Sequence, residues 1–336
     1  MGDRLSLGST VNIIMRKGIK IGILHNPNSR NGSLWYKKQI STLGKERVLA
    51  VSSKDVSEIP SALAQMANAG VTHLAIVGGD GTLDAVLTAL RHYSSFENEP
   101  IIGLFNAGTT NMTFKDLGFK TYSRKPLLKF IQSAHAGRLK LKSHKPLRVQ
   151  SQELKHPLLG FFLGVGAIPR AIHYTRQKYH KKGITNSLSE GAVILSSLWR
   201  LIQSSNIQED LLLKPIQSKL TLEQGEKTSD MVMLSITSLE KLLIGLRPYK
   251  TNKEHLSIMG ISHPYNNLIK NIPELHKGTK ELDVMQDTNL LATQSPWCTI
   301  AFDGEWTLDG EMFQSTHNAP LEITLAAPLD FAVGAV

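Results

Sequence analysis

The sequence predicts an α/β domain built on a parallel sheet, followed by a β-rich second domain. The first part of the chain alternates short apolar runs with helical patterns, and this alternation implies right-handed crossovers between parallel strands. After about residue 137 the pattern changes to alternating apolar and polar positions, which is typical of half-buried strands. The 336 residues are enough for two domains, and 41% hydrophobic with 20% charged residues indicates a chain that buries a core.

Four apolar runs are predicted to be the strands of the first domain. They are KIGILHN, RVLAVSS, THLAIVGG and PIIGLFN, at residues 20–26, 47–53, 72–79 and 100–106. Two helices are predicted between them. The segment VSEIPSALAQMANAG begins near an Asp/Ser cap and ends at Gly70, and TLDAVLTALRHY repeats its apolar residues every three to four positions. In such a sheet, ligands bind at the carboxyl ends of the strands.

The second domain is predicted from four alternating segments, RLKLKSHKPLRVQ, SKLTLEQ, DMVMLSITS and LEITLAAPLDFAV. We therefore assign residues 1–137 to the first domain and residues 138–336 to the second. One helical insert, residues 185–205, interrupts the strands and carries a broad apolar face. This face either packs on the sheet of its own domain or lines an apolar substrate cleft.

Composition narrows the class of protein. The single cysteine, Cys298, excludes an internal disulfide framework and a cysteine-based zinc site, and it fits a reducing compartment. The N-terminus has no apolar core of signal-peptide length, and no later stretch approaches the roughly 18 to 20 apolar residues that span a bilayer. We expect a cytoplasmic protein whose contact with a membrane, if it has one, is peripheral.

The net charge of +10 is concentrated in one part of the chain. Residues 120–182 contain 15 Lys and Arg against one acid, Glu153, which leaves a local charge of +14 and about −4 elsewhere. We refer to residues 120–182 as the basic block. A block of this kind can attract nucleic acid, phosphorylated substrates or an anionic membrane surface, and a solvated basic face is the alternative interpretation.

The segment AIVGGDGTLDAVLTAL places one carboxylate, Asp80, between glycines where an apolar strand ends. Gly79 and Gly81 let a ligand approach the main chain closely, and Thr82 can cap a helix whose first N–H groups attract anions. The turn therefore predicts a phosphate site. Because a carboxylate alone would repel phosphate, Asp80 is expected to act through Mg²⁺ or to accept a proton from a hydroxyl. The alternative is an ordinary strand-to-helix turn.

Two further turns of similar composition follow other strands. GLFNAGTTNMTF, at residues 103–114, places hydroxyl and amide donors suited to phosphate at Gly108, Thr109, Thr110 and Asn111. HNPNSRNG, at residues 25–32, is rich in turn-forming residues. A parallel sheet brings such strand ends together, so the three turns jointly favour a nucleotide as the ligand.

The motifs NPNSRNG, GGDGT and GTTN, followed by a β-rich half with DGE near its end, resemble the diacylglycerol kinase catalytic-domain family. This family includes bacterial diacylglycerol, sphingosine and YegS-like lipid kinases. The resemblance implies an ATP site between an N-terminal α/β domain, of the kind that NAD kinases share, and a C-terminal β-sandwich domain. It further implies dependence on Mg²⁺ and transfer of the γ-phosphate to a lipid hydroxyl, with no nucleic-acid partner.

The resemblance also implies roles for single residues. Asp80 is expected to be a catalytic or metal-linked carboxylate. The residues expected at the nucleotide are Asn26, Pro27, Asn28 and Ser29, the weaker match Ser53, Gly79, Gly81 and Thr82 of the phosphate turn, and Gly108, Thr109 and Asn111 of the second loop.

The general base of the family is the glutamate of its DGE motif, and this chain has two copies in IAFDGEWTLDGEMF. We prefer Glu311, because a loop and the closing strand follow it, whereas Asp303-Gly304 suits a hairpin turn. Glu305 is the alternative. If the chain turns at residues 303–304, Glu311 is expected near Asp80 and Glu305 at the far, solvent-exposed end of the hairpin.

Departures from the family pattern keep other functions open. The family usually has Asn-Glu where this chain has Asp84-Ala85, and commonly Asp where this chain has Met112. These changes could alter a polar contact with the substrate or remove activity, so a lipid- or nucleotide-binding protein without catalysis is one alternative. NAD kinase is another, because GGDGT and the Asn106-x-Gly108 spacing fit it, although the Thr-Thr-Asn continuation favours a lipid kinase.

Overall fold

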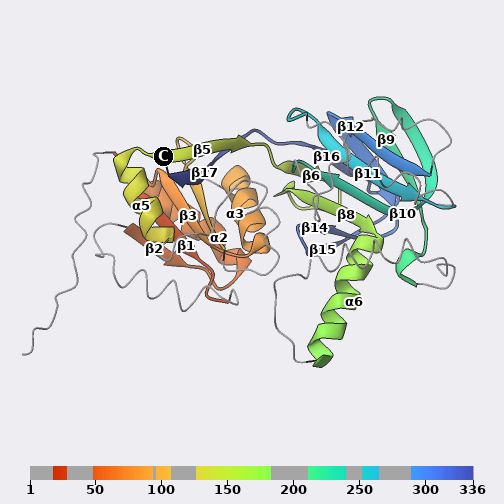
Figure 1. Ribbon diagram of the computed structural model, residues 1–336, viewed down its shortest axis with the longest axis horizontal. Coiled ribbons are helices and arrows are strands. Elements are labelled where there is room, and N and C mark those ends of the chain that lie inside the picture. The colour runs from red at the N-terminus through yellow and green to blue at the C-terminus, as the bar shows by residue number, and fades with distance from the viewer. Residues whose placement is uncertain are drawn as a thin grey trace, which may run out of the picture.

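Two bodies lie side by side in the computed structural model of the chain (Figure 1). The structure describes residues 18–28, 48–93, 96–106, 126–182, 211–239, 252–264 and 289–335. One body holds a six-stranded sheet with helices, and the other holds an eleven-stranded sheet. The predicted fold class is thus confirmed. The predicted helical insert, residues 185–205, lies outside the described residues.

The six-stranded sheet contains the four predicted strands and two strands from later in the chain. Its order is β2 (Val48–Ser52), β1 (Ile21–His25), β3 (His73–Gly78), β4 (Ile101–Asn106), β17 (Leu329–Ala335) and β5 (Leu139–His144). The first five strands run parallel and β5 runs antiparallel to β17. Because β5 and β17 belong to this sheet, the boundary predicted between residues 137 and 138 does not coincide with a division between the sheets.

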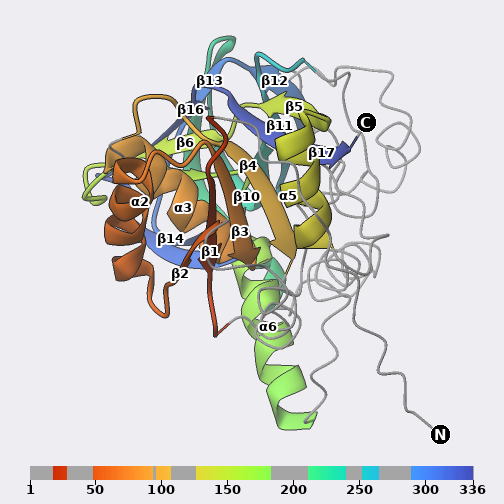
Figure 2. The same ribbon diagram turned by 90° about the vertical axis from the view of Figure 1, so that its left-hand side faces the viewer.

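Helices cover both faces of the six-stranded sheet, as the apolar character of its strands requires. Side chains alternate between the faces: Leu24 packs on the side of α2 (Ile59–Asn68) and α3 (Asp80–His92), and Ile23 on the side of α5 (Pro126–Ala136). Figure 2 shows the strands between these two layers. A 3-10 helix, η1 (Val56–Glu58), precedes α2, which ends just before Gly70 as predicted.

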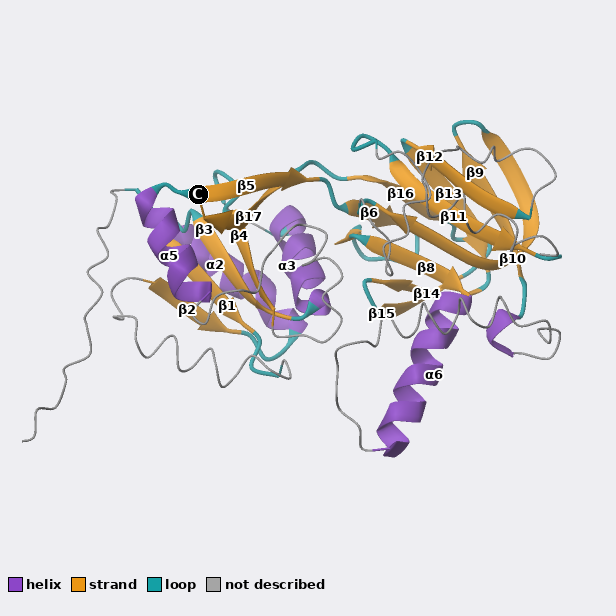
Figure 3. Cartoon of the chain, in the orientation of Figure 1, coloured by secondary structure: helices purple, strands orange, loops and turns teal. Residues whose placement is uncertain are grey.

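The eleven-stranded sheet is antiparallel throughout and contributes to two core clusters, in the larger of which Phe302 and Trp306 are fully buried. Its strands are β6 (Leu147–Gln150), β7 (Leu158–Gly160), β8 (Phe162–Gly166), β9 (Ile216–Leu222), β10 (Gly225–Thr237), β11 (Leu256–Ser262), β12 (Leu290–Ser295), β13 (Trp297–Phe302), β14 (Gly304–Leu308), β15 (Glu311–Ser315) and β16 (Leu321–Leu325). A 3-10 helix, η3 (Leu211–Leu213), precedes β9, and α6 (Ala167–Lys182) projects from this body (Figure 3).

The hairpin predicted at Asp303-Gly304 is wrong. The strands on either side of this dipeptide, β13 and β14, are not paired with each other: β13 pairs with β9 and β16, and β14 pairs with β8 and β15. The two-residue hairpin turn lies instead at Asp309-Gly310, where Leu308 pairs with Glu311. Both turn residues have positive φ, 47° and 97°, which matches the type I′ turn that favours Asp-Gly. Glu305 therefore lies within β14 and not at a hairpin end.

The two bodies meet along α3. The backbone N–H of Leu159, in β7, donates a hydrogen bond of 2.9 Å to the Thr88 hydroxyl. The guanidinium of Arg91 donates to the carbonyls of Ala327 (2.9 Å) and Pro328 (3.3 Å), in the segment where the chain returns from β16 to β17. Because these contacts join α3 to the second body, α3 fixes where that body lies relative to the turn at its own N-terminus.

Candidate active site

The glycine turn after β3 presents the N-terminus of α3 to a cavity. Gly79 is extended, with φ −94° and ψ −176°, and it is the N-cap residue of α3, with Asp80 as the first helical residue. No side chain among the described residues caps this end. A β-carbon on Gly78 would lie 2.6 Å from the β-carbon of Thr82, so this position needs glycine. The turn therefore leaves a helix N-terminus available to an anion.

The end of β1 is tied to the same turn. Asn26 donates from its side-chain amide to the Thr82 hydroxyl at 2.9 Å, and its side-chain oxygen accepts the backbone N–H of Asn28 at 2.9 Å. Asn28 in turn donates to the carbonyl of Lys54, beyond the end of β2, at 2.9 Å. Ser53 donates its backbone N–H to the carbonyl of His25 at 2.9 Å. Three neighbouring strand ends thus meet, as the parallel topology predicts.

The Asp309-Gly310 turn carries Glu311 across from the second body to the glycine turn. A β-carbon on Gly81 would overlap Oε1 of Glu311, so the glutamate carboxylate lies directly against the backbone of Gly81. Glycine at position 81 makes this approach possible. The structure therefore brings Glu311 and Asp80 to the same cavity, although they are far apart in the sequence.

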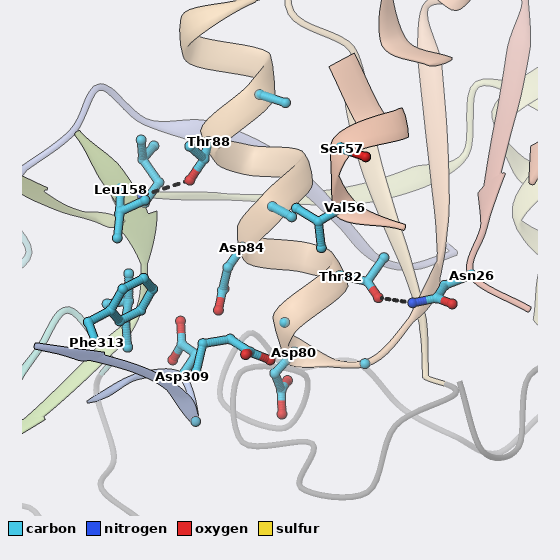
Figure 4. A pocket seen from close by; sticks show the side chains of 18 of the residues that line it. Asn26, Val56, Ser57, Asp80, Thr82, Asp84, Thr88, Leu158, Asp309 and Phe313 are labelled. Atoms are coloured by element: carbon cyan, nitrogen blue, oxygen red, sulfur yellow. Dashed lines mark hydrogen bonds between the residues drawn. The ribbon is translucent and has the colours of Figure 1, made fainter. Parts of the chain in front are cut away.

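The cavity has a volume of about 900 Å³ and a polar and an apolar part. Figure 4 shows Asn26, Asp80, Thr82, Asp84 and Asp309 around it. Further along α3 the lining becomes mainly apolar, with Val56, Pro60, Ala85, Ala89, Leu158, Leu159, Met312 and Phe313. A cavity of this kind, apolar with a few converging polar groups, suits a ligand that has both an anionic and an apolar part.

The carboxyl groups of Asp84, which is buried, and Asp309, which is half-buried, face each other across the junction of the two bodies (Figure 4). Burial, and then the neighbouring charge of Asp309, raise the pKa of Asp84 well above its usual range. Burial also raises the pKa of Asp309, to about 6, although hydrogen bonds to Asp309 oppose this shift. Two adjacent carboxylates cannot both ionise without a large cost in a buried site, so the pair retains a proton more readily than exposed acids do.

Glu305 lies in a different place from Glu311. Its carboxylate forms an ion pair with His173 of α6 at 3.1 Å, and it lines a separate cavity of about 370 Å³ together with Arg170 and Asp303. Arg170 donates to the carbonyl of Leu212 at 3.2 Å. The two copies of the DGE motif therefore face two different cavities.

The predicted site residues fall into three groups. Those that line the large cavity are Asn26, Gly79, Asp80, Gly81, Thr82 and Glu311. Pro27, Asn28 and Ser53 do not line it, although Asn28 is hydrogen-bonded to Asn26 and Ser53 to the end of β1. Ser29, Gly108, Thr109 and Asn111, like Met112, lie outside the described residues.

The sequence predictions missed residues that the cavity brings together. Asp84 appeared only as a departure from the family pattern, and Asp309 only as a neighbour of Glu311, but both line the cavity. The available signal was helical spacing, because Asp84 lies four residues after Asp80 and so on the same face of α3. Val56 and Ser57 carried no such signal, since only the fold brings η1 to this site.

Comparisons with known proteins give one family match and similar folds. Residues 20–143 match the family model of the diacylglycerol kinase catalytic domain. The fold resembles the crystal structure of a diacylglycerol kinase from Bacillus anthracis str. Sterne, with a TM-score of 0.60 and 13% identity over 95% of this chain and 98% of that one. A candidate diacylglycerol kinase from the same strain gives a TM-score of 0.65 at 15% identity, with the same coverage of both chains. Among curated proteins, no sequence matches significantly.

The family match thus covers residues 20–143, and it supports the resemblance that the motifs of the chain indicate. The likeness to the solved structures extends over both bodies and concerns the fold.

Proposed function

We propose that this protein is an ATP-dependent lipid kinase that transfers the γ-phosphate to the hydroxyl of a lipid such as a diacylglycerol or a sphingoid base. The observation that carries the proposal is the position of Glu311 against Gly81. A carboxylate from the second body thereby lies beside the anion-binding end of α3, in one cavity with Asp80. Phosphoryl transfer needs this combination, because it depends on positioning the two substrates and on neutralising charge.

The residues present fit ATP and Mg²⁺. The uncapped N-terminus of α3 and the closely approached backbone of Gly81 suit the phosphates. No group of three or more His, Cys, Asp or Glu among the described residues is arranged to hold a metal ion. Mg²⁺ binds one or two carboxylates and completes its shell with substrate phosphates and water, so it needs no such group. Asp80 would supply that carboxylate, and the ion would neutralise charge on the phosphates.

In this proposal Glu311 accepts the proton of the lipid hydroxyl as the oxygen attacks the phosphate. A general base must come within about 3 Å of the proton donor, and a carboxylate beside Gly81 can do so for a hydroxyl held next to the phosphates. The apolar side chains further along α3 give the acyl or alkyl part of the acceptor a place in the same cavity.

The direct test is incubation of the purified protein with radiolabelled ATP, Mg²⁺ and mixed micelles that contain diacylglycerol or sphingosine. We expect label in the lipid fraction only when Mg²⁺ is present. Label in NADP when NAD is the acceptor would replace the proposal with a NAD kinase. Stabilisation of the protein by ATP without transfer to any acceptor would replace it with a binding protein on the same scaffold.

We further propose that the protein acts in the cytoplasm as a peripheral protein at an anionic membrane surface. No described helix combines the length and the apolarity needed to cross a bilayer. The basic block contributes three exposed residues to the region of α5 and β5: Lys129 on α5, Lys140 on β5, and Arg138 between these two elements. Lys145 is instead paired with Glu254. Charges on one outer edge of the first body suit contact with anionic lipids.

Binding to vesicles tests this surface. We expect the protein to bind phosphatidylglycerol vesicles and to leave them as salt rises from 0.1 M to 1 M, where the screening length falls from about 10 Å to about 3 Å. Replacing Lys129, Arg138 and Lys140 together by Glu should weaken binding by at least about tenfold, since each basic residue near the surface contributes roughly 1 kcal/mol. Lys253→Glu, outside the block, is the control. Equal binding to neutral vesicles would contradict the prediction.

A further inference from the structure

One face of α3 makes the polar contacts between the two bodies. Asp84, Thr88 and His92 follow each other at intervals of four residues, so they lie on one side of the helix. Thr88 accepts the N–H of Leu159, and the ring of His92 stacks on that of His156 at 5.1 Å. Asp84 faces Asp309 at the end of this row that is nearer the glycine turn. Of these three contacts between α3 and the second body, the contact of Asp84 with Asp309 therefore lies nearest to Glu311.

The hydrogen bonds around Asp309 show which carboxyl group acts as acceptor. Its Oδ2 accepts the backbone N–H of Phe161 at 2.6 Å, and its Oδ1 accepts that of Phe162 at 3.0 Å. A β-carbon on Gly160 would lie 2.6 Å from Oδ2, so the carboxylate is closely packed. Two N–H donors stabilise the charged form of Asp309.

Asp84 has the opposite surroundings. Its side chain is buried, with 8% of its surface exposed, and neither carboxyl oxygen accepts a hydrogen bond from a donor among the described residues. A buried carboxylate without a donor is costly, whereas a protonated carboxyl can donate to a neighbouring acceptor. The acceptor that faces Asp84 is Asp309.

The charges near Asp84 also favour the protonated form. Asp80 on the same helix and Asp309 and Glu311 from the hairpin are all acidic, and each raises the pKa of Asp84. The other elements packed on α3 offer no compensating charge at this point: the sequences of α2 and β7 contain no ionisable residue, and His73 of β3 lies at the opposite end of that strand. The basic side chain that lines the cavity, His156, stacks on His92.

We propose that Asp84 is protonated and donates its O–H to Asp309, and that this hydrogen bond fixes the Asp309-Gly310 turn that carries Glu311. Asp84 and Asp309 are then positioning residues, which act on the reaction through Glu311. Their catalytic consequence rests on the proposed function, but the shared proton does not. Loss of the proton would leave two buried charges facing each other and would push the hairpin away from α3.

The proposal fixes the sign of a pH effect. Above roughly pH 4 an unfolded chain has released the Asp84 proton, whereas the folded chain retains it because its pKa is raised. The folded state therefore loses stability as the pH rises from roughly 4, and the loss is complete once the pH exceeds the pKa of the folded state. An amide at position 84 donates to Asp309 at every pH, so Asp84→Asn should abolish this contribution.

The experiment compares the melting temperatures of the wild type, Asp84→Asn and Asp309→Asn from pH 5 to pH 8. Relative to the wild type, Asp84→Asn should gain at least roughly 4 °C between these two pH values. Asp309→Asn should melt lower than the wild type at both, because its NH₂ group would replace one of the two carboxylate oxygens that accept the N–H groups of Phe161 and Phe162. Asp230→Asn, which removes an exposed carboxylate from β10, is the control and should follow the wild type. A constant difference between Asp84→Asn and the wild type would overturn the proposal.

Two further measurements test the protonation of Asp84 separately from its effect on lipid phosphorylation. In a ¹³C NMR titration of the wild-type protein, the carboxyl of Asp84 should titrate well above the usual range of aspartates. Titration of this carboxyl within the usual range would overturn the proposal even if the variants do not fold. In lipid phosphorylation, the ratio of kcat at pH 9 to kcat at pH 7 should be higher for Asp84→Asn than for the wild type. An unchanged ratio in an active enzyme would overturn the positioning role alone, whereas absence of activity in the wild type would count against the proposed function.

Discussion

Glu311→Gln should reduce lipid phosphorylation by at least about 100-fold, because the amide keeps the shape of the side chain but cannot accept the proton of the attacking hydroxyl. The loss should appear in kcat, since the substitution leaves the proposed ATP site at the backbone of the glycine turn unchanged. The melting temperature should change little, because the Glu311 carboxylate is on the surface of the cavity and its residue is exposed. The measurement is steady-state transfer from labelled ATP, with melting curves of both proteins.

The chain offers a matched control in its second DGE motif. Glu305→Gln makes the same chemical change in the adjacent strand, where the carboxylate pairs with His173 and lines the other cavity. We expect its activity to stay within about twofold of the wild type, because an exposed ion pair contributes little. The reverse result would assign the base to Glu305. Full activity of both variants would show that neither glutamate is the base.

The sequence predicts the fold best where buried positions require apolar residues. The four strands of the first domain were predicted within a residue or so because a parallel sheet covered on both faces needs continuous apolar runs. Two helices in the basic block, α5 and α6, were not predicted. The sequence of α6 is rich in charged and polar residues and has little apolar periodicity. The segment was therefore recognised only by its charge, as part of the basic block, and not as a helix.

The hairpin error has a local cause. Both Asp303-Gly304 and Asp309-Gly310 carry the dipeptide that favours a type I′ turn, and the local sequence gives no reason to choose between them. The choice depends on which strands β14 can pair with, and that is decided by β8, which is more than 130 residues earlier in the chain. The segment predicted as a single closing strand, LEITLAAPLDFAV, forms two strands: β16 in the eleven-stranded sheet and β17 in the six-stranded sheet. This division also depends on pairing with distant strands, which the local sequence does not reveal.

The candidate site was predictable where a motif has a chemical signature. Glycines around a carboxylate indicate a phosphate turn in any fold, so Asp80, Gly81 and Thr82 were identified from the sequence. The pairing of Asp84 with Asp309 was not, because residues 225 positions apart meet only when the second body lies against α3. At position 84 an acid is an unremarkable surface residue in a helical pattern, and burial alone makes it distinctive.

Asp80→Asn should leave the protein folded and reduce phosphoryl transfer by at least about 100-fold. Asp80 is only partly buried and is the first residue of α3, where removing its charge costs roughly 0.3–1 kcal/mol through the helix dipole. Activity is affected much more strongly, because an amide neither accepts a proton nor holds Mg²⁺ as a carboxylate does.

The dependence on Mg²⁺ distinguishes the two roles of Asp80. If Asp80 acts through Mg²⁺, a higher Mg²⁺ concentration should restore part of the rate of Asp80→Asn; if Asp80 accepts a proton, it should not. Asp230→Asn controls for the loss of one charge, and wild-type turnover with a normal Mg²⁺ dependence in Asp80→Asn would refute both roles.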